Sequence, residues 1–344
     1  WFDHSLGGGT ESYSLRKFQE LRKNYIIIRL QGLGSFVKVS FDGIDIKLNV
    51  VIKLEKILSS LKYYSIESVI INNLVGYSDI SCLLKKISFL KKNGTNIKFL
   101  LHDFFCVCPS INMINNENYW CDCRNISICT ECLKKIKNRL FTNIYSIEKW
   151  HEIWSHFFEI YVDDIIVFSR SSKEIFCRFY ANSERKIKLI PHEIPFLRKV
   201  NIKSHNCVNI ATIGHIAFNK GLSHLYEIDK IITEFKNLNM YIIGYSDVMF
   251  KNIKQTGMYD VKNLPSIVEN LEIDAIVILS ICPETFSYTT SEAISMGVPV
   301  VCFNLGAQAE KVCVYKKGLV LNKIAIRENL YEILDFISKI KTKN

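Results

Sequence analysis

Short apolar runs rich in β-branched residues alternate with helix-length stretches along most of this chain, and no other feature limits its fold as strongly. Such runs predict strands at residues 25–30, 68–71, 97–101, 165–168, 208–213, 240–243, 275–279 and 298–303. Amphipathic segments such as 11–22 and 222–235 separate most of these runs and predict helices. Strands that alternate with helices favour an α/β protein whose parallel sheets carry helices on both faces.

The chain is long enough for two domains, because its 344 residues exceed the usual size of one hydrophobic core. Pro191, Pro195 and the polar stretch 203–206 interrupt the apolar rhythm before a new strand-loop-helix unit begins. We therefore predict an N-terminal domain over 1–196 and a C-terminal domain over 197–344 that ends in an amphipathic helix. Two Rossmann-like domains of this kind are expected to face each other across a ligand-binding cleft.

Composition narrows the class of protein. Hydrophobic residues make up 48% of the chain, which excludes a disordered protein. The net charge of +10 suits anionic partners such as nucleotide diphosphates, lipid phosphates, a membrane surface or nucleic acid, although scattered lysines also suit an ordinary solvated surface. No apolar run reaches 18 residues and no signal peptide is visible, so a cytoplasmic location is expected. The chain begins at Trp1 rather than Met, which suggests one part of a larger polypeptide.

The segment 280–301 is the most informative for function. Glu284 is predicted in a loop just after a strand, and Glu292 follows eight residues later, early in a helix. Backbone N–H groups near residues 286–289 would open this helix, and a helix N-terminus attracts phosphate. An alternative is purely structural, because Thr289-x-x-Glu292 has the pattern of a capping box.

This segment, together with the Gly-Val-Pro-Val that ends it, resembles the E-x7-E region of retaining GT-B glycosyltransferases. Two flanking segments carry the same resemblance. Ile213-Gly-His-Ile-Ala-Phe-Asn-Lys-Gly221 resembles the family's Gly-Arg-x4-Lys-Gly loop, and Asn304-Leu-Gly-Ala-Gln-Ala-Glu310 resembles its loop after the later strand. The resemblance implies the GT-B fold, with two Rossmann-like domains and parallel sheets facing across a cleft.

The resemblance also implies residue roles. Glu292 would hold the donor ribose, Glu284 the transferred sugar, and Lys220 the diphosphate leaving group. Further donor contacts are expected at Gly214, His215, Phe286, Ser287, Tyr288, Thr289, Gly306, Ala307, Gly8 and Gly9. His215 departs from the family pattern, because many relatives have an arginine there and an imidazole offers no bidentate fork. A loop histidine without a role is the alternative.

The N-terminal half carries weaker motifs. Gly7-Gly-Gly-Thr10 precedes a predicted helix and resembles the family's cleft-facing Gly-rich loop, although a Gly run is also a common turn. His102 follows the strand at 97–101 and resembles the family's cleft histidine, which would make it a catalytic contact to the donor. A structural histidine at a strand end is the alternative.

Six of the twelve cysteines crowd the loop 106–132. Cys129-x-x-Cys132 has the spacing of a tight metal-binding turn, and Cys108 and Cys121 would complete a tetrahedral thiolate set. We predict a structural zinc there, with a loop of free thiols as the alternative. GT-B catalysis itself characteristically needs no metal cofactor.

Taken together, the resemblance implies retaining transfer of a sugar from a nucleotide diphosphate sugar to a glycan or lipid-linked acceptor. Its nearest likeness is to enzymes of bacterial surface polysaccharide and O-antigen synthesis, which adds peripheral contact at the inner face of the membrane as an expectation. One alternative is a catalytically inactive GT-B protein that binds sugar or serves as a scaffold. A basic nucleic-acid-binding module is a further alternative, but it would need clustered charges, and here they are dispersed.

Overall fold

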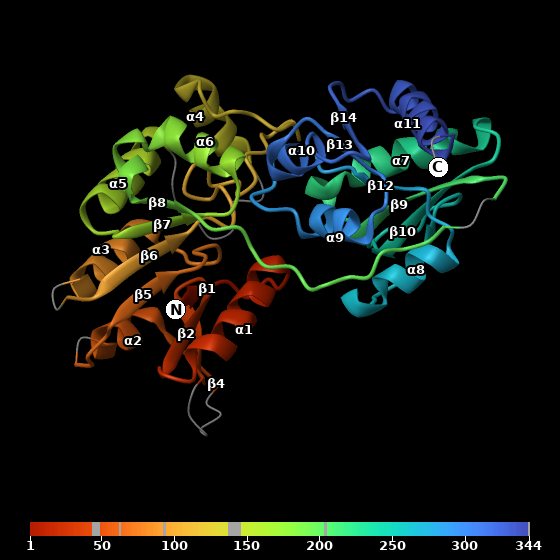
Figure 1. Ribbon diagram of the computed structural model, residues 1–344. Coiled ribbons are helices and arrows are strands. Elements are labelled where there is room, and N and C mark those ends of the chain that lie inside the picture. Colours follow the sequence, from red (N-terminus) through yellow and green to blue (C-terminus); the bar gives the residue numbers. More distant parts are fainter. Residues whose placement is uncertain (43–48, 62, 92–93, 137–145, 203–204, 343–344) are drawn as a thin grey trace. The chain divides into compact units, whose positions relative to one another are not determined.

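The computed structural model describes residues 1–42, 49–61, 63–91, 94–136, 146–202 and 205–342. The chain divides into two compact units, residues 1–192 and 193–344 (Figure 1). The sequence places this boundary a few residues later, at 196/197, and residues 203–204 of the predicted polar stretch lie outside the described part. Each unit holds its own sheet and its own buried hydrophobic residues, which in unit 2 form a cluster on each face of the sheet.

The sheet of unit 1 has the strand order β4-β3-β2-β1-β5-β6-β7-β8. Its strands are β1 (Phe2–Asp3), β2 (Ile27–Leu33), β3 (Phe36–Asp42), β4 (Asn49–Lys53), β5 (Ser68–Ile71), β6 (Asn96–Leu100), β7 (Asp164–Val167) and β8 (Ile187–Leu189). From β2 to β8 along the sheet every pairing is parallel, as predicted. The antiparallel strands β3 and β4 at one edge were not predicted. Only Gly34 and Ser35 separate β2 from β3, and so short a connection can join only antiparallel strands.

Six α-helices of unit 1 are described: α1 (Gly9–Leu21), α2 (Leu54–Leu61), α3 (Ile80–Leu90), α4 (Ile126–Lys135), α5 (Ile147–Ile160) and α6 (Arg170–Phe179). Side-chain caps begin several of them. Asp79 accepts the Cys82 N–H at α3, and Ser169 accepts the Ser172 N–H at α6. The core around α5 is aromatic, and the Trp150 and Trp154 side chains of this helix are fully buried.

The sheet of unit 2 is wholly parallel, in the order β11-β10-β9-β12-β13-β14. Its strands are β9 (Val208–His215), β10 (Leu238–Tyr245), β11 (Lys254–Gln255), β12 (Ala275–Ile278), β13 (Val300–Phe303) and β14 (Gly318–Leu321). Its α-helices are α7 (Leu222–Ile231), α8 (Leu264–Asn270), α9 (Tyr288–Met296), α10 (Gly306–Val312) and α11 (Ile326–Lys341).

Alternate residues of these strands face opposite sides of the sheet. Ile210 and Val277 belong to the core that contains α7 and α11, whereas Ala211 and Ile276 belong to the core with α8, α9 and α10. Both faces are therefore covered, which explains why the strands read as continuous apolar runs. Figure 1 shows the helices of this unit on both sides of its sheet.

Candidate functional site

The strand order of unit 2 reverses direction at β9. From β9 the chain proceeds outward through β10 to β11, then returns to place β12 on the other side of β9. In open parallel sheets such a reversal leaves a crevice beyond the carboxyl ends of the two central strands, and ligands bind there. The predicted residues Gly214 and Lys220 lie at and just after the end of β9, and Glu284 follows β12. The strand order thus brings these three predicted residues to the same edge of the sheet.

Gly221 brings the loop after β9 against the end of β12. Its φ is +91°, and a Cβ at this position would lie 2.2 Å from the Leu279 carbonyl oxygen. The Ile281 N–H also donates to the Asn219 carbonyl at 3.1 Å. Only glycine permits this approach, because any other side chain would collide with the backbone of the neighbouring strand. The preceding residue, Lys220, is thereby carried to the loop that holds Glu284.

The Lys220 ammonium and the Glu284 carboxylate form an ion pair, with Nζ 2.7 Å from Oε1. The Glu284 side chain is only 12% exposed, whereas that of Lys220 is 35% exposed. Burial opposes ionisation of Glu284, but Lys220 and hydrogen bonds from Ser280 and Ser287 outweigh it and lower the pKa of this carboxyl. Glu284 is therefore a carboxylate at neutral pH, suited to accept hydrogen bonds rather than to donate a proton.

Helix α9 begins beside this pair. Its N-cap is Ser287, which has φ +60° and a hydroxyl bonded to Thr290 Oγ1 at 2.7 Å. The predicted residues Tyr288 and Thr289 lie in the first turn. The capping-box alternative is therefore wrong, because Thr289 is inside the helix rather than at its N-cap. Glu292 lies further along α9, and its side chain is buried.

Gly214 lies against the start of α9, since a Cβ built on it would be 3.9 Å from Thr289 Cγ2. His215, the next residue, contacts a different set of side chains. Its ring stacks on Tyr245 at 4.5 Å, and Nε2 lies 3.4 Å from the Asp247 carboxylate. Its neighbours in the structure are thus an aromatic ring and an exposed acid, not the Lys220–Glu284 pair.

The first turn of α10 holds the loop of Glu284 in place. Gly306 has φ +56°, and a Cβ there would lie 2.5 Å from Pro283 Cα. The Ala307 N–H donates to the Glu284 carbonyl at 3.0 Å. The buried amide of Gln308 accepts the Glu284 N–H and donates to the Cys282 carbonyl, each at 3.0 Å. Gln308 was missed from the sequence, where a lone glutamine in a helix gives no signal.

In unit 1, His102 lies just beyond β6 within a cluster of aromatic rings. It stacks on His192 with centroids 5.2 Å apart, and its ring also lies 4.6 Å from Phe168 and 4.9 Å from Tyr13. Burial, with smaller contributions from His192 and His4, holds the pKa of His102 well below its usual range. The ring is therefore neutral near pH 7 and can accept or donate a hydrogen bond without carrying charge.

The Gly-rich loop of unit 1 leads into α1, which begins at Gly9 rather than near residue 11. Gly7 and Gly8 have φ of +76° and +82°, and both glycines of the predicted pair, Gly8 and Gly9, are exposed. Positive φ explains the use of glycine here.

The cysteine loop brings sulfur atoms together, although not in the predicted set. The Cys123 sulfur lies 3.6 Å from that of Cys121, and the two thiols share a hydrogen bond. The sulfur of Cys132 instead accepts the Asn116 N–H at 3.3 Å. Among the described residues, no three or more His, Cys, Asp or Glu side chains are arranged to hold a metal ion. The predicted set of Cys108, Cys121, Cys129 and Cys132 is thus not preassembled, and the zinc site stays a prediction.

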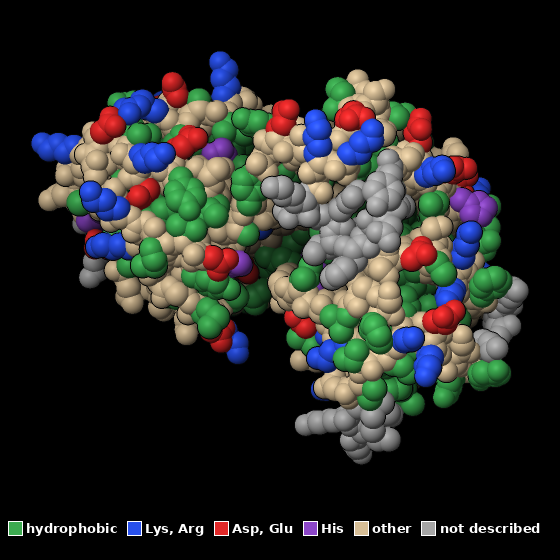
Figure 2. Space-filling model, turned by 180° about the vertical axis from the view of Figure 1, so that it is seen from behind, with side chains coloured by type: hydrophobic (Ala, Val, Ile, Leu, Met, Phe, Trp, Pro, Cys, Tyr) green, Lys and Arg blue, Asp and Glu red, His purple; other side chains and the backbone are tan. Residues whose placement is uncertain are grey.

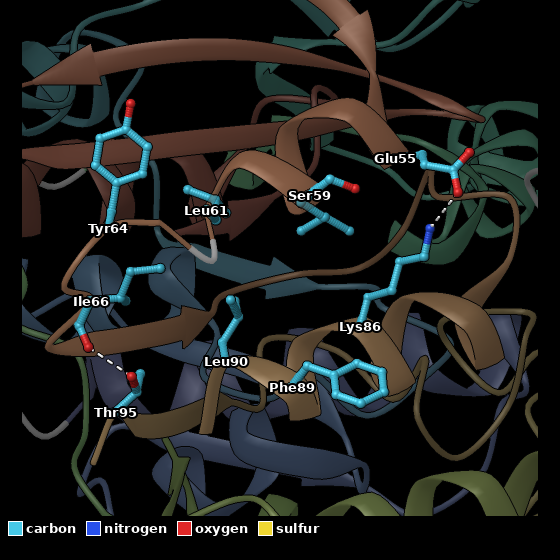
Figure 3. Close-up of a pocket in the computed structure, with 10 residues that line it drawn as sticks. Glu55, Ser59, Leu61, Tyr64, Ile66, Lys86, Phe89, Leu90 and Thr95 are labelled. Carbon is cyan, nitrogen blue, oxygen red and sulfur yellow. Dashed lines mark hydrogen bonds and ion pairs between the residues drawn. The ribbon is translucent and has the colours of Figure 1, made fainter. Parts of the chain in front are cut away.

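A separate hollow of about 500 Å³ lies in unit 1 between α2 and α3. Figure 3 shows Leu61, Ile66 and Leu90 lining it, with the Glu55–Lys86 ion pair at one end. It contains none of the predicted site residues. Within the described ranges, no helix has the length and apolar character needed to cross a bilayer.

Known proteins were compared with this chain by family, by sequence and by structure. Residues 193–339 match the family described as glycosyl transferases group 1. A comparison with curated protein sequences gives no match.

Several solved structures share the fold at low sequence identity. Sucrose-phosphate synthase from Thermosynechococcus elongatus gives a TM-score of 0.59 at 12% identity, covering 98% of this chain and 86% of that one. HepE of Anabaena in complex with UDP gives 0.55 at 12% identity, covering 83% and 72%. The lipopolysaccharide outer core galactosyltransferase WaaB gives 0.50 at 14% identity, covering 83% and 70%.

The protein thus has the GT-B fold, as the sequence predicts. The family match lies within unit 2, and the likeness in fold to the solved structures extends over both units.

Proposed function

We propose that this protein is a retaining glycosyltransferase that moves a sugar from a nucleotide diphosphate sugar to a hydroxyl group of a glycan or lipid-linked acceptor. The observation that carries the proposal is the Lys220–Glu284 ion pair, placed beside the N-terminus of α9 at the reversal point of a parallel sheet. A cation, a buried carboxylate and a helix N-terminus in one place suit a ligand that carries both a diphosphate and sugar hydroxyls.

Each group then has a distinct task. The diphosphate takes the N-terminal turn of α9 and attracts the Lys220 ammonium, which is the more exposed partner of the pair. Glu284 accepts hydrogen bonds from the transferred sugar, and Glu292, buried within α9, holds the ribose. Resemblance alone assigns the remaining donor contacts, including His102 and His215, and these stay predictions.

The chemistry needs no proton from Glu284, whose lowered pKa keeps it ionised. The bond between the anomeric carbon and the diphosphate oxygen breaks, and the acceptor oxygen forms the new bond on the same face. The acceptor proton passes to the departing diphosphate. The protein contributes orientation and stabilises the charge that develops on the diphosphate, chiefly through Lys220.

We also propose that this transferase acts in the synthesis of a surface polysaccharide. It draws on the sequence resemblance and on the likeness to WaaB, a lipopolysaccharide galactosyltransferase by its description. We propose that the chain acts on the cytoplasmic side, with peripheral contact where the acceptor is membrane-borne. Lys and Arg side chains are interspersed with acidic ones on the face in Figure 2, which does not favour the nucleic-acid alternative.

The test begins with thermal shift against UDP, GDP, dTDP and CMP. UDP comes first because HepE binds UDP and UDP-glucose. One nucleotide should raise the melting temperature by mass action. Its sugars are then offered with glycan acceptors, and NMR of the product reads the anomeric configuration. Inverted product would remove the retaining mechanism, and binding without transfer to any acceptor would support the inactive scaffold instead.

A further inference from the structure

The loop that joins β12 to α9, residues 280–287, is held by one face of helix α10. Ala307 and Gln308 bond its first half, around Glu284. One turn further along the same helix face, Lys311 reaches its second half. This lysine was not singled out by the motifs of the sequence, and the proposed mechanism does not use it.

The Lys311 ammonium has a full set of acceptors in this loop and at the start of α9. It donates to the Phe286 carbonyl, to the Ser287 carbonyl at 3.3 Å and to Ser291 Oγ at 2.6 Å. An ammonium has three N–H groups, so three acceptors use all of them. Nζ also lies 3.3 Å from the centroid of the Phe286 ring, which favours a positive charge at that point.

These contacts bear on the most constrained residue of the loop. Ser287 has φ +60° and ψ +85°, in the left-handed region that costs a non-glycine residue about 1 kcal/mol or more. A hydrogen bond from its side chain helps to lower the pKa of Glu284. Ser287 is also the N-cap residue of α9. Hydrogen bonds from Lys311 to the carbonyls of residues 286 and 287 offset this cost and help to hold the loop in this shape.

We propose that Lys311 is a positioning residue that orders the 280–287 loop and thereby aligns Glu284 and the N-terminus of α9 for the donor. The proposal rests on the proposed function for the identity of the ligand, but not for the ordering itself. Lys311 acts through backbone carbonyls and one serine hydroxyl.

The protonation of Lys311 gives the proposal a pH signature. Burial lowers its pKa to about 7, against the opposing effect of the Glu284 and Glu310 carboxylates that face it. Below this pH the ammonium satisfies three acceptors. Above it the neutral amine keeps two N–H groups and no longer carries the cost of a buried charge. A disordered loop would expose Lys311 and restore its higher pKa, so the ordered loop binds this proton less tightly and its order should rise as the pH rises through about 7.

The experiment compares Lys311→Met with Lys317→Met. Lys317 donates to the Gly297 carbonyl at the other end of α9, so its loss removes a similar lysine contact without touching the loop. Hydrogen exchange reads the backbone protection of residues 284–291, corrected for intrinsic rates, at pH about 6 and about 8. Calorimetry with UDP, or with the nucleotide that thermal shift identifies, reads affinity at the same pH values.

At pH about 8 we expect Lys311→Met to lose about tenfold in loop protection and in nucleotide affinity, the size of one net hydrogen bond, while Lys317→Met keeps both. Wild-type protection should rise from the lower pH to the higher, and that of Lys311→Met should not. Equal protection in wild type and Lys311→Met would overturn the proposal. Loss of protection in a protein that binds no nucleotide would support the positioning role and count against the proposed function.

Discussion

Lys220 and Glu284 contact each other across two loops of unit 2, with 2.7 Å between the ammonium nitrogen and a carboxylate oxygen. The contact joins residues 64 positions apart in the sequence, one after β9 and the other after β12. Each charge thus has a partner, and neither is left buried alone. A diphosphate would compete with Glu284 for the more exposed Lys220, which links donor binding to release of the carboxylate for the sugar.

We expect Lys220→Met to weaken binding of a nucleoside diphosphate by about 2 kcal/mol, because it removes a cation from a partly desolvated site. The change also leaves Glu284 buried without its counter-charge, so the melting temperature should fall. Lys230→Met is the matched control, since Lys230 is exposed in α7 of the same unit. Calorimetry with both variants decides the matter, and equal affinities would remove Lys220 from the donor site.

Substitutions of Glu284 and of Glu292 should have different effects on nucleotide binding and on sugar transfer. Glu292→Gln should weaken the bare nucleotide as well as the nucleotide sugar, because a ribose contact is present in both. Glu284→Gln should leave the bare nucleotide bound and slow transfer by at least about tenfold, since a contact to the sugar acts mainly in the transition state. Nucleotide affinity, melting temperature and transfer rate are measured for each. Two variants indistinguishable from the parent would mean that the active site lies elsewhere.

Gly221→Ala should lower stability and nucleotide affinity together. The new Cβ would meet the Leu279 carbonyl oxygen at 2.2 Å and push the Lys220 loop away from Glu284. Gly257→Ala is a close control, because Gly257 has a similar φ of +81°, yet a Cβ placed there would have no atom of the described residues within 4 Å. We expect about 1 kcal/mol of lost stability from the backbone strain in the control, and clearly more in Gly221→Ala. Similar thermal denaturation of the two variants would refute the steric argument.

For the cysteine loop we keep the prediction of about one structural zinc per chain. Four sulfur ligands at about 2.3 Å from a tetrahedral zinc lie about 3.8 Å apart, close to the 3.6 Å between Cys121 and Cys123. Because the Cys123 sulfur lies beside that of Cys121, whereas the Cys132 sulfur accepts the Asn116 N–H, zinc content should drop more in Cys123→Ser than in Cys132→Ser. Cys82→Ser, at an exposed site, is the control. Metal-free protein that melts normally with chelator present would establish free thiols instead.

Much of the fold could be predicted because its signals are local. The β-branched runs locate most of the parallel strands of both units, and helix-length segments locate α1, α7 and α11. The hairpin edge of unit 1 was missed, since β3 alternates apolar and polar residues instead of forming a continuous apolar run, and β4 is short and mostly exposed. Periodicity detects burial, and an edge strand that faces solvent gives little of it.

The sequence by itself determined which residues of unit 2 we propose to carry the chemistry, because Lys220, Glu284 and Glu292 stand in short motifs beside strand ends. Only the tertiary structure decided how they meet. The ion pair depends on a strand order that returns β12 to the side of β9, and on the absence of a Cβ at Gly221. The supporting groups Gln308 and Lys311 likewise act through carbonyls far along the chain. Such contacts are long-range and leave no periodic or local pattern, so folding alone brings them together.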